Sequence, residues 1–568
     1  MQRTLKASTV ILFIICAVLI CYANSFRAPF LWDDEVLILR NHYIKSWNYL
    51  RPIFSTSHFR GGGEGGNFYR PLQIVTYSFD YSLWKLNPFG FHLTNLILHC
   101  LAGLAVYFLI TKISTNNLIG LFSALFFVVH PVHTETVTYI AGRADILAAV
   151  FLLFAFLSFM KIPTTSCAKR YLYWVASCLL YIFALLSKES ALIFLFLTLF
   201  YGLCFVRKKE FKPWIPIYIS FLLISGVYVF IRAVILAFPE TRSLSLIAQA
   251  PLFLRFITIP KIWLIYFGLL ILPVYLHMER HFLLTSVGDP YFWLGLILLV
   301  LTFWLLKLTY RRSRIAFFYS GWFVIALIPV LNIVPLNATM AEHWLYLPAI
   351  GFWALVVTGI GRFFRQTSKK YKRIFLILAC LFFLFYCGRT ILRNFQWRDP
   401  LRLYAHDLKY SPQSFLLHNN LGVELFRRGE LERAGREFQA AVKISPRYAT
   451  SHNNLGVVLE NQGRMEEALA HYQVAIGLNN YILAYGNLGR GYLKIKQPEK
   501  ARAILEKGQE LHPQDVEITY YLAIAYFEER KFAQAREKFE KVSRLTLHYK
   551  DTDVYLKKLE EIKPLLQK

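Results

Sequence analysis

Three consecutive acidic residues, Asp33, Asp34 and Glu35, follow the first apolar segment of this chain. Adjacent carboxylates repel one another and therefore favour a bound proton or cation. Such a group can act as a general base towards a hydroxyl, bind a divalent metal such as Mg or Mn, or do both. We therefore predict a catalytic role for these residues, with Asp33 and Asp34 as candidate metal ligands. The alternative is a solvated loop that happens to be acidic.

A second polar group lies between two apolar segments, where the run from His130 to Glu135 is followed by Gly142-Arg143-Ala144-Asp145. Ionisable residues at the ends of membrane helices are costly unless they are paired or hydrated, so Arg143 and Asp145 predict a polar cavity. The alternative is a local ion pair of Arg143 with Asp145 or Glu135 that serves packing. His130 and His133 have a spacing that permits metal binding, but no third ligand follows from the spacing.

Three further motifs carry charges at the ends of apolar segments: Tyr69-Arg70-Pro71, Ser187-Lys188-Glu189 and Ala341-Glu342-His343. Taken singly, each is more often a charge that reaches the membrane interface. Together with the acidic groups they supply both signs of charge, and cations at that level suit a phosphate or pyrophosphate. We therefore include these residues, with His133 and Glu135, in a predicted polar site.

The elements that position these groups are membrane helices. Of the 568 residues 56% are hydrophobic, and the mean hydropathy of +0.41 is too high for a soluble multidomain protein. A net charge of +28 would suggest nucleic-acid binding on a soluble chain. Here the charge follows the loops between apolar segments, and we predict membrane lipids, not nucleic acid, as the surroundings.

A crossing needs about 20 apolar residues, and the sequence predicts eleven crossings. They cover about 8–24, 91–111, 117–132, 137–160, 171–187, 189–206, 213–237, 290–309, 315–335, 344–361 and 373–391. Lys and Arg concentrate in every second short loop, which places the N-terminus inside. This bias persists only if a twelfth stretch, 257–276, is re-entrant or lies at the interface. Eleven crossings then export the C-terminal region. The first 24 residues also fit a signal peptide, but an anchored acidic cluster favours a span.

After residue 398 the composition turns polar and a period near 34 residues begins. Leu421-Gly422, Leu455-Gly456, Leu488-Gly489 and Leu522-Ala523 recur, each followed 13 residues after the Leu by an alanine. This is the tetratricopeptide pattern, in which small residues let paired helices approach closely. We therefore predict an all-α chain with a membrane domain at 1–398 and an α-solenoid of four repeats at 399–568. The repeats are expected to bind a peptide, or else to serve as a spacer or dimerisation module.

These features resemble the transmembrane and tetratricopeptide-repeat O-mannosyltransferase family, which belongs to the multi-spanning GT-C class of glycosyltransferases. The resemblance rests on Phe30 to Glu35 with Asn41, Tyr69 to Leu72, Phe91 to Leu96 with His99, His130 to Glu135 with Gly142 to Asp145, Leu186 to Glu189, and Ala341 to Pro348. The order of these stretches ahead of a repeat array is specific. The short array indicates a bacterial-type member.

The resemblance implies an inverting transfer of one sugar, mannose or another hexose, from a dolichyl- or undecaprenyl-phosphate donor to a hydroxyl of an exported protein. Asp33 or Asp34 would be the general base, and Asp145 the second acid of the exported face. Charge on the leaving phosphate needs a cation, and Arg143, Lys188, Arg70 and His343 are the candidates in that order. The active site and repeats would face the periplasm, or the lumen of the endoplasmic reticulum in a eukaryote.

Three alternatives stay open. Sugar transfer to a lipid or envelope glycan keeps the enzyme class and changes the acceptor. A non-catalytic scaffold that presents the repeats would not require acids and bases on one face of the membrane domain. A transporter is expected to carry ionisable residues in the middle of its spans, whereas here they lie at span ends.

Overall fold

The computed structural model describes residues 6–162, 165–207, 209, 211–238, 245–546 and 548–566. Helices make up the described residues, with a single isolated β-bridge between Arg280 and Met340 and no strand within these ranges. The chain forms two compact units, Met1–Ser411 and Pro412–Lys568. The all-helical fold class predicted from the sequence is confirmed, and the first unit extends beyond the predicted boundary at residue 398 to include helix α17.

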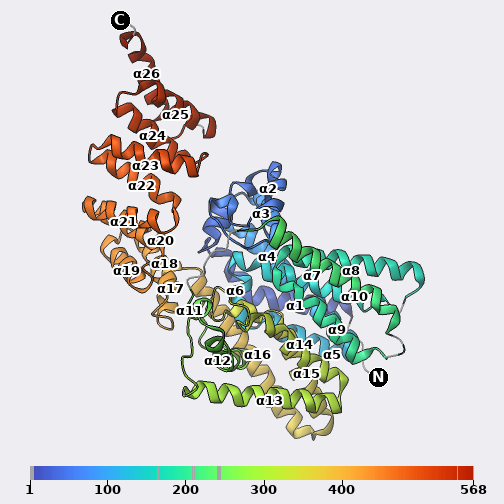
Figure 1. The fold of residues 1–568 in the computed structure, drawn as a ribbon. Helices are drawn as coiled ribbons and strands as arrows, with labels where there is room; N and C mark the ends of the chain where they lie inside the picture. Colours follow the sequence, from blue (N-terminus) through green and yellow to red (C-terminus); the bar gives the residue numbers. More distant parts are fainter. Residues whose placement is uncertain are drawn as a thin grey trace. The chain divides into compact units, whose positions relative to one another are not determined.

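The first unit is a bundle of long apolar helices (Figure 1). Its helices are α1 (Ala7–Tyr22), α2 (Leu50–Ser55), α3 (Pro71–Trp84), α4 (Pro88–Ser114), α5 (Asn117–Val128), α6 (Thr134–Val137), α7 (Arg143–Phe159), α8 (Cys167–Ser187), α9 (Ile193–Phe205), α10 (Ile215–Phe230), α11 (Leu246–Gln249), α12 (Leu252–Ile271), α13 (Pro290–Arg312), α14 (Arg314–Leu327), α15 (Pro348–Gln366), α16 (Lys369–Trp397) and α17 (Pro400–Leu408).

Eight helices among the described residues are long and apolar enough to cross a membrane, and a bent pair, α5 with Pro131–Val137, makes a ninth candidate. Three shorter apolar helices, Glu189–Phe205, Arg314–Val330 and Pro348–Phe364, accompany them. Apart from α12, these elements occupy the eleven predicted segments. The apolar side chains on their outer faces are exposed in the structure, as expected of helices that face lipid.

Helix α12, the doubtful twelfth stretch, has the length and composition of a span. Near its start, Arg255 donates to the backbone oxygens of Asn332 (3.3 Å) and Ile333 (2.9 Å). At its end, the Leu270 carbonyl accepts from the ring of His130 at 3.1 Å. Asn332 and His130 both lie in connections at the same end of the bundle as the Glu135–His343 contact. The re-entrant or interfacial course expected for this stretch stays a prediction, because α12 is among the helices that are long and apolar enough to cross.

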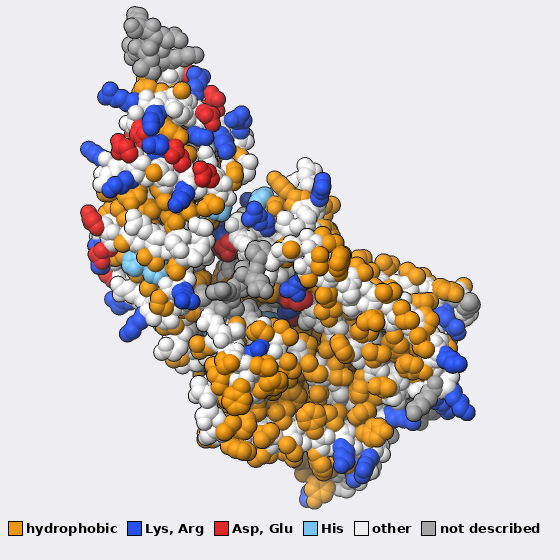
Figure 2. Space-filling model, viewed as in Figure 1, with side chains coloured by type: hydrophobic (Ala, Val, Ile, Leu, Met, Phe, Trp, Pro, Cys, Tyr) orange, Lys and Arg blue, Asp and Glu red, His pale blue; other side chains and the backbone are white. Residues whose placement is uncertain are grey.

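Charge is distributed unevenly over the first unit. Figure 2 shows a surface dominated by hydrophobic side chains, with Lys and Arg gathered along the rim where the α7–α8 and α15–α16 turns lie. The turn between α13 and α14 contributes Arg311, Arg312 and Arg314. Basic turns at one end of a helical bundle are typical of the cytoplasmic side of a membrane protein.

The second unit stacks four helix pairs, and each pair is one predicted repeat. The pairs are α18 (Phe415–Arg427) with α19 (Leu431–Ile444), α20 (Ala449–Asn461) with α21 (Met465–Asn479), α22 (Ile482–Lys494) with α23 (Pro498–Leu511), and α24 (Val516–Glu528) with α25 (Phe532–Leu545), followed by α26 (Thr552–Leu566). A Cβ added to Gly456 would lie 2.6 Å from the ring of Tyr472. This close approach explains why a small residue follows the repeated leucine.

Candidate functional site

The predicted site residues gather at one end of the membrane unit, opposite the basic turns. We call this region the polar end and define it by Asp33, Arg70, Glu135, Lys188 and Glu342. Each of these residues lies in a connection between helices or directly beside a helix terminus. The sequence segments that supply them are far apart, so the fold of the bundle is what brings them together.

Asp33 stands in a strained turn after α1. Trp32, immediately before it, has a φ of +53°, a left-handed conformation that is a genuine outlier for a bulky residue. The backbone N–H of Asp33 donates to the Tyr139 hydroxyl at 3.1 Å, and Tyr139 also hydrogen-bonds the Asp33 carboxylate. Tyr139 in turn stacks on Trp397. The Asp33 carboxylate is thereby fixed in place and remains partly exposed.

Burial raises the pKa of Asp33 to about 6. The hydrogen bond from Tyr139 opposes this shift, and the nearby carboxylate of Glu64 adds to it. Arg70 lowers and Glu279 raises the same pKa, so both of these side chains lie near Asp33. A carboxyl group with a pKa near 6 is well matched to accept a proton from a hydroxyl near neutral pH.

Asp34 has a structural role that its neighbour lacks. It is 1% exposed. One carboxylate oxygen accepts the backbone N–H of Leu31 at 3.0 Å, and the other accepts the N–H of Ala141 at 2.9 Å. Both oxygens therefore tie the acidic turn to the segment before α7. This geometry separates the two adjacent aspartates, since only Asp33 presents a carboxylate at the surface of the site.

The predicted metal ligands Asp33 and Asp34 have different surroundings. Both oxygens of Asp34 are occupied by backbone donors, and Glu35 opens a short π-helix, Glu35–Leu39, that continues away from the turn. In the part of the chain that the structure describes, no group of three or more His, Cys, Asp or Glu side chains is arranged to hold a metal ion. The Mg or Mn binding predicted for Asp33 and Asp34 stays a prediction.

Arg143, the first-ranked phosphate ligand, is fully buried at the start of α7. Its Nη1 forms an ion pair with Asp80 at 2.6 Å. Its Nε donates to Asn95 at 2.6 Å, and its Nη2 donates to the Phe91 carbonyl at 2.8 Å. Its guanidinium lies 4.6 Å from the ring of Tyr77. The partner is neither Asp145 nor Glu135, and the guanidinium is taken up by protein groups.

Two other predicted cations are paired with predicted acids. Lys188, directly after α8, contacts both carboxylate oxygens of Asp145 at 2.7 Å. Asp145 lies in the first turn of α7, where the helix dipole favours a negative charge. Arg70, which caps α3 ahead of Pro71, holds Glu189 through two bonds of 3.2 and 2.7 Å. The Lys188–Asp145 pair joins the consecutive helices α7 and α8, the Arg70–Glu189 pair joins segments 119 positions apart, and both pairs are only partly exposed.

His343 is paired with Glu135 across the bundle. The carboxylate of Glu135 contacts His343 Nδ1 at 2.9 Å and accepts the backbone N–H of His343 at 3.0 Å. Gly142 is needed beside this contact, because a Cβ there would lie 2.6 Å from the carbonyl oxygens of Glu135 and Thr136. His133 is buried, and neither ring nitrogen has a hydrogen-bond partner among the described residues.

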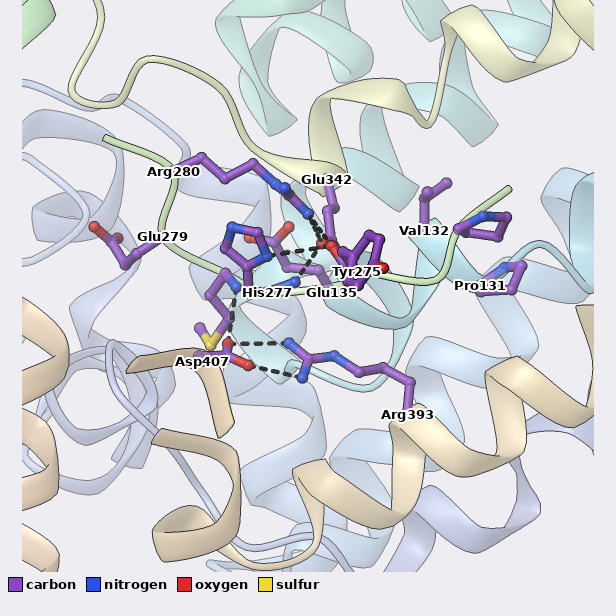
Figure 3. Close-up of polar contacts among 12 residues, drawn as sticks. Pro131, Val132, Glu135, Tyr275, His277, Glu279, Arg280, Glu342, Arg393 and Asp407 are labelled. Carbon is purple, nitrogen blue, oxygen red and sulfur yellow. Dashed lines mark hydrogen bonds and ion pairs between the residues drawn. The ribbon is translucent and has the colours of Figure 1, made fainter. Parts of the chain in front are cut away.

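Glu342 belongs to a network that sequence analysis only partly identified. It accepts from Arg280 and from the backbone N–H of His277, both at 2.6 Å. Asp407 accepts from Met278 N–H at 2.9 Å and binds Arg393 through both carboxylate oxygens (2.9 and 3.0 Å). Figure 3 shows the two carboxylates on either side of the segment around His277. Burial raises the pKa of Glu342, with Arg280 opposing the shift.

Sequence analysis missed Arg280, His277, Arg393 and Asp407. One signal was available, because His277-Met278-Glu279-Arg280-His281 is a charged run between two apolar helices. Arg393 and Asp407 lie in and beyond the last long helix, in a stretch whose charges have no distinctive spacing. Their pairing depends on how α17 folds back, which local sequence does not encode.

Comparison with known proteins identified one repeat family and several relatives of this chain. The tetratricopeptide repeat family model matches residues 408–481 and 487–545. Protein O-mannosyl-transferase Tmtc3 of Drosophila melanogaster is 27% identical over 507 residues, covering 75% of this chain and 54% of the relative. Protein O-mannosyl-transferase F38B6.6 of Caenorhabditis elegans is 27% identical over 448 residues, covering 76% of this chain and 62% of the relative. Human protein O-mannosyl-transferase TMTC1 is 34% identical over 196 residues, which is 34% of this chain and 21% of the relative.

These matches confirm the predicted resemblance to protein O-mannosyltransferases and the predicted tetratricopeptide repeats of this chain. The chain spans little more than half of the length of the first of these relatives and under two thirds of the second.

Proposed function

We propose that this chain is a membrane glycosyltransferase that moves one sugar, mannose or another hexose, from a polyprenyl phosphate to a hydroxyl of a protein. The observation that carries the proposal is Asp33. It is held in a strained turn by Tyr139, its pKa is raised to about 6, and it lies at the end of the bundle where the predicted cations gather. The similarity to named protein O-mannosyl-transferases supports the same activity.

In the proposed reaction the Asp33 carboxylate accepts the proton of the acceptor hydroxyl. The hydroxyl oxygen attacks the anomeric carbon of the sugar, and the bond between that carbon and the phosphate oxygen breaks. The electron pair of this bond leaves with the polyprenyl phosphate, and attack from the opposite face inverts the anomeric centre. A positioned base of matched pKa contributes about 10²- to 10⁴-fold to such a step.

Arg70 and Lys188 are the proposed cations that face the departing phosphate. Each is already oriented by a carboxylate partner, Glu189 for Arg70 and Asp145 for Lys188. Cations in fixed positions stabilise charge as it develops and need no rearrangement during the reaction. Arg143 takes a positioning role in this scheme, because its contacts with Asp80 and Asn95 fix the start of α7.

The repeats are proposed to bind the protein acceptor. Asn454 donates to Asn419 at 3.0 Å, and Asn487 donates to Asn453 at 2.9 Å, so amide side chains link successive repeats. Asn454 and Asn487 are partly exposed. A side-chain amide has two N–H donors, and one N–H of each residue is left to meet the carbonyl oxygens of an extended polypeptide. This arrangement favours a protein over a glycan as the acceptor.

The proposed topology places the polar end and the repeats on the exported side, in a periplasm or an endoplasmic lumen. The basic rim of the first unit, at the opposite end of the bundle, supports this orientation.

The test is sugar transfer by the full-length protein in lipid nanodiscs, supplied with radiolabelled polyprenyl-phosphate hexoses and an unstructured Ser/Thr-rich polypeptide, with and without Mg²⁺ or Mn²⁺. Asp33→Asn should lower turnover about 10²-fold or more while the protein still folds. Glu64→Gln is the matched change of a carboxylate near Asp33 and should retain activity at neutral pH. If no donor gives sugar transfer, with or without metal, the transferase proposal is wrong and the scaffold alternative remains.

A further inference from the structure

A cleft of about 400 Å³ lies beside the polar end, between the end of α10 and the segment that leads into α3. Its walls include Leu192, Val229 and Phe238, which are apolar, and the polar residues Asn67, Tyr228 and Arg232. Asn67 is three residues before Arg70, and Leu192 is three residues after Glu189. The cleft therefore lies near the Arg70–Glu189 ion pair, and its volume suits a small ligand.

Arg232 gives this cleft an uncompensated positive charge. Its Nη2 donates to the Asn67 carbonyl at 3.1 Å, and within the described residues it forms no ion pair with a carboxylate. Arg70 differs, because Glu189 neutralises it through two bonds. Arg232 is half-buried. A guanidinium that is half-buried in mostly apolar walls favours an anion, and its planar fork of donors matches a phosphate.

Tyr228 supplies a second unmet donor in the same cleft. Its side chain is 6% exposed, and its hydroxyl is buried with no hydrogen-bond partner among the residues described in the structure. Leaving a buried hydroxyl unpaired costs free energy, so such a group calls for a ligand or ordered water. Tyr228 and Arg232 lie one helical turn apart and both line the cleft, so a single anionic group can bond to both.

The cleft is placed to receive its ligand from the membrane. Helix α10 lies within a candidate span, Lys212–Ile235. Val227, Val229 and Phe230 on this helix, and Val234 just after it, are exposed, and this outer surface is apolar. Val229 belongs both to that surface and to the cleft wall. An amphiphile in the bilayer can therefore place its phosphate on Arg232 and Tyr228 while its hydrocarbon chain stays along α10.

We infer that this cleft binds the phosphate of a polyprenyl phosphate, with Arg232 and Tyr228 as the recognising side chains. The inference rests on the proposed function for the identity of the lipid, since the cleft adjoins the site where the sugar is transferred. In this inference Arg232 binds the negatively charged phosphate of the lipid. Arg232 lies at the end of an apolar segment, and no sequence motif distinguishes it. Arg70 and Lys188 then act on the oxygen of this same phosphate that carries the sugar.

The experiment measures equilibrium binding of a radiolabelled polyprenyl phosphate that carries no sugar to the full-length protein in nanodiscs, so no turnover is required. The variants are Arg232→Gln and Tyr228→Phe. Arg255→Gln is the matched control, because Arg255 also donates to backbone carbonyls but is not among the described residues that line this cleft. Competition with unlabelled polyprenyl phosphate, phosphatidylglycerol and inorganic phosphate identifies the source of the phosphate.

We expect Arg232→Gln to weaken binding about tenfold or more and Tyr228→Phe to weaken it about threefold or more, while Arg255→Gln stays within about twofold of the parent. Unlabelled polyprenyl phosphate alone should compete efficiently. Tyr228→Phe removes only a hydroxyl that lacks a partner, so it should fold like the parent and decide the question if Arg232→Gln does not fold. Parent-like binding by Tyr228→Phe and Arg232→Gln, absence of binding by the parent, or equal competition by phosphatidylglycerol would overturn the inference. Sugar transfer that persists with any of these results would leave the proposed function intact.

Discussion

Arg143 and Asp80 form an ion pair that no solvent reaches: Nη1 and Oδ2 are 2.6 Å apart, and both side chains are 0% exposed. The pair joins the start of α7 to α3. Asn95 and the Phe91 carbonyl complete the hydrogen bonding of the guanidinium from α4. Three helices of the membrane unit are thus fixed to one another through a single side chain.

Breaking this pair should destabilise the membrane unit strongly. Asp80→Asn leaves the Arg143 charge buried without compensation, which costs about 3–5 kcal/mol. The measurement is the fraction of protein that stays monodisperse after heating in detergent. Glu64→Gln is the control, because its ion pair with Arg40 is about a third exposed and should contribute under about 1 kcal/mol. Equal heat resistance of the two variants would show that the buried pair does not hold the helices.

The activity should depend on pH through Asp33. The general base must be deprotonated, and its pKa is raised to about 6, so kcat/KM should rise with pH through that value. Lowering the pH from 7 to 5 should reduce the rate about tenfold. Glu64 raises the pKa of Asp33, so Glu64→Gln should move the midpoint to lower pH. A midpoint near 4 in the parent would exclude a buried Asp33 as the base.

The helical fold and the residues of the polar end could be predicted because their signals are local. Apolar runs of span length, basic turns and the 34-residue period each act over short stretches of sequence. The acids and cations at segment ends were identified in the same way. Lys188 and Glu189, for example, lie directly between two apolar runs. A charge at such a position is costly unless it is paired or hydrated, so it indicates a functional or structural role.

The partners of these residues could not be predicted, because pairing depends on tertiary geometry. Arg143 pairs with Asp80, 63 positions away in the sequence, and not with the nearby Asp145. The same holds within the acidic triplet, where composition makes Asp33 and Asp34 equivalent. Only the backbone donors of Leu31 and Ala141 distinguish them.

Glu342 should control the order of the segment between α12 and α13. It accepts the His277 N–H at 2.6 Å, whereas Asp407 accepts the Met278 N–H at 2.9 Å. Glu342→Ala removes the first acceptor and leaves Arg280 without its carboxylate, so amide hydrogen exchange in the peptide around His277 should increase about tenfold or more. Figure 3 shows Glu279 directed away from this network, so Glu279→Gln is the control. Equal exchange in both variants would contradict the role of Glu342.

The asparagines that link successive repeats should determine acceptor binding. Asn454 and Asn487 each donate one side-chain N–H to an asparagine of the preceding repeat. The second N–H of each is proposed to donate to the backbone of the acceptor. Asn487→Leu should therefore raise the KM for a polypeptide acceptor about tenfold and leave kcat for a short soluble acceptor unchanged, because the repeats do not form the chemical site. Gln473→Leu, which changes an exposed amide on the second helix of a repeat, is the matched control. A parent-like KM in Asn487→Leu would assign the repeats to a partner other than the acceptor.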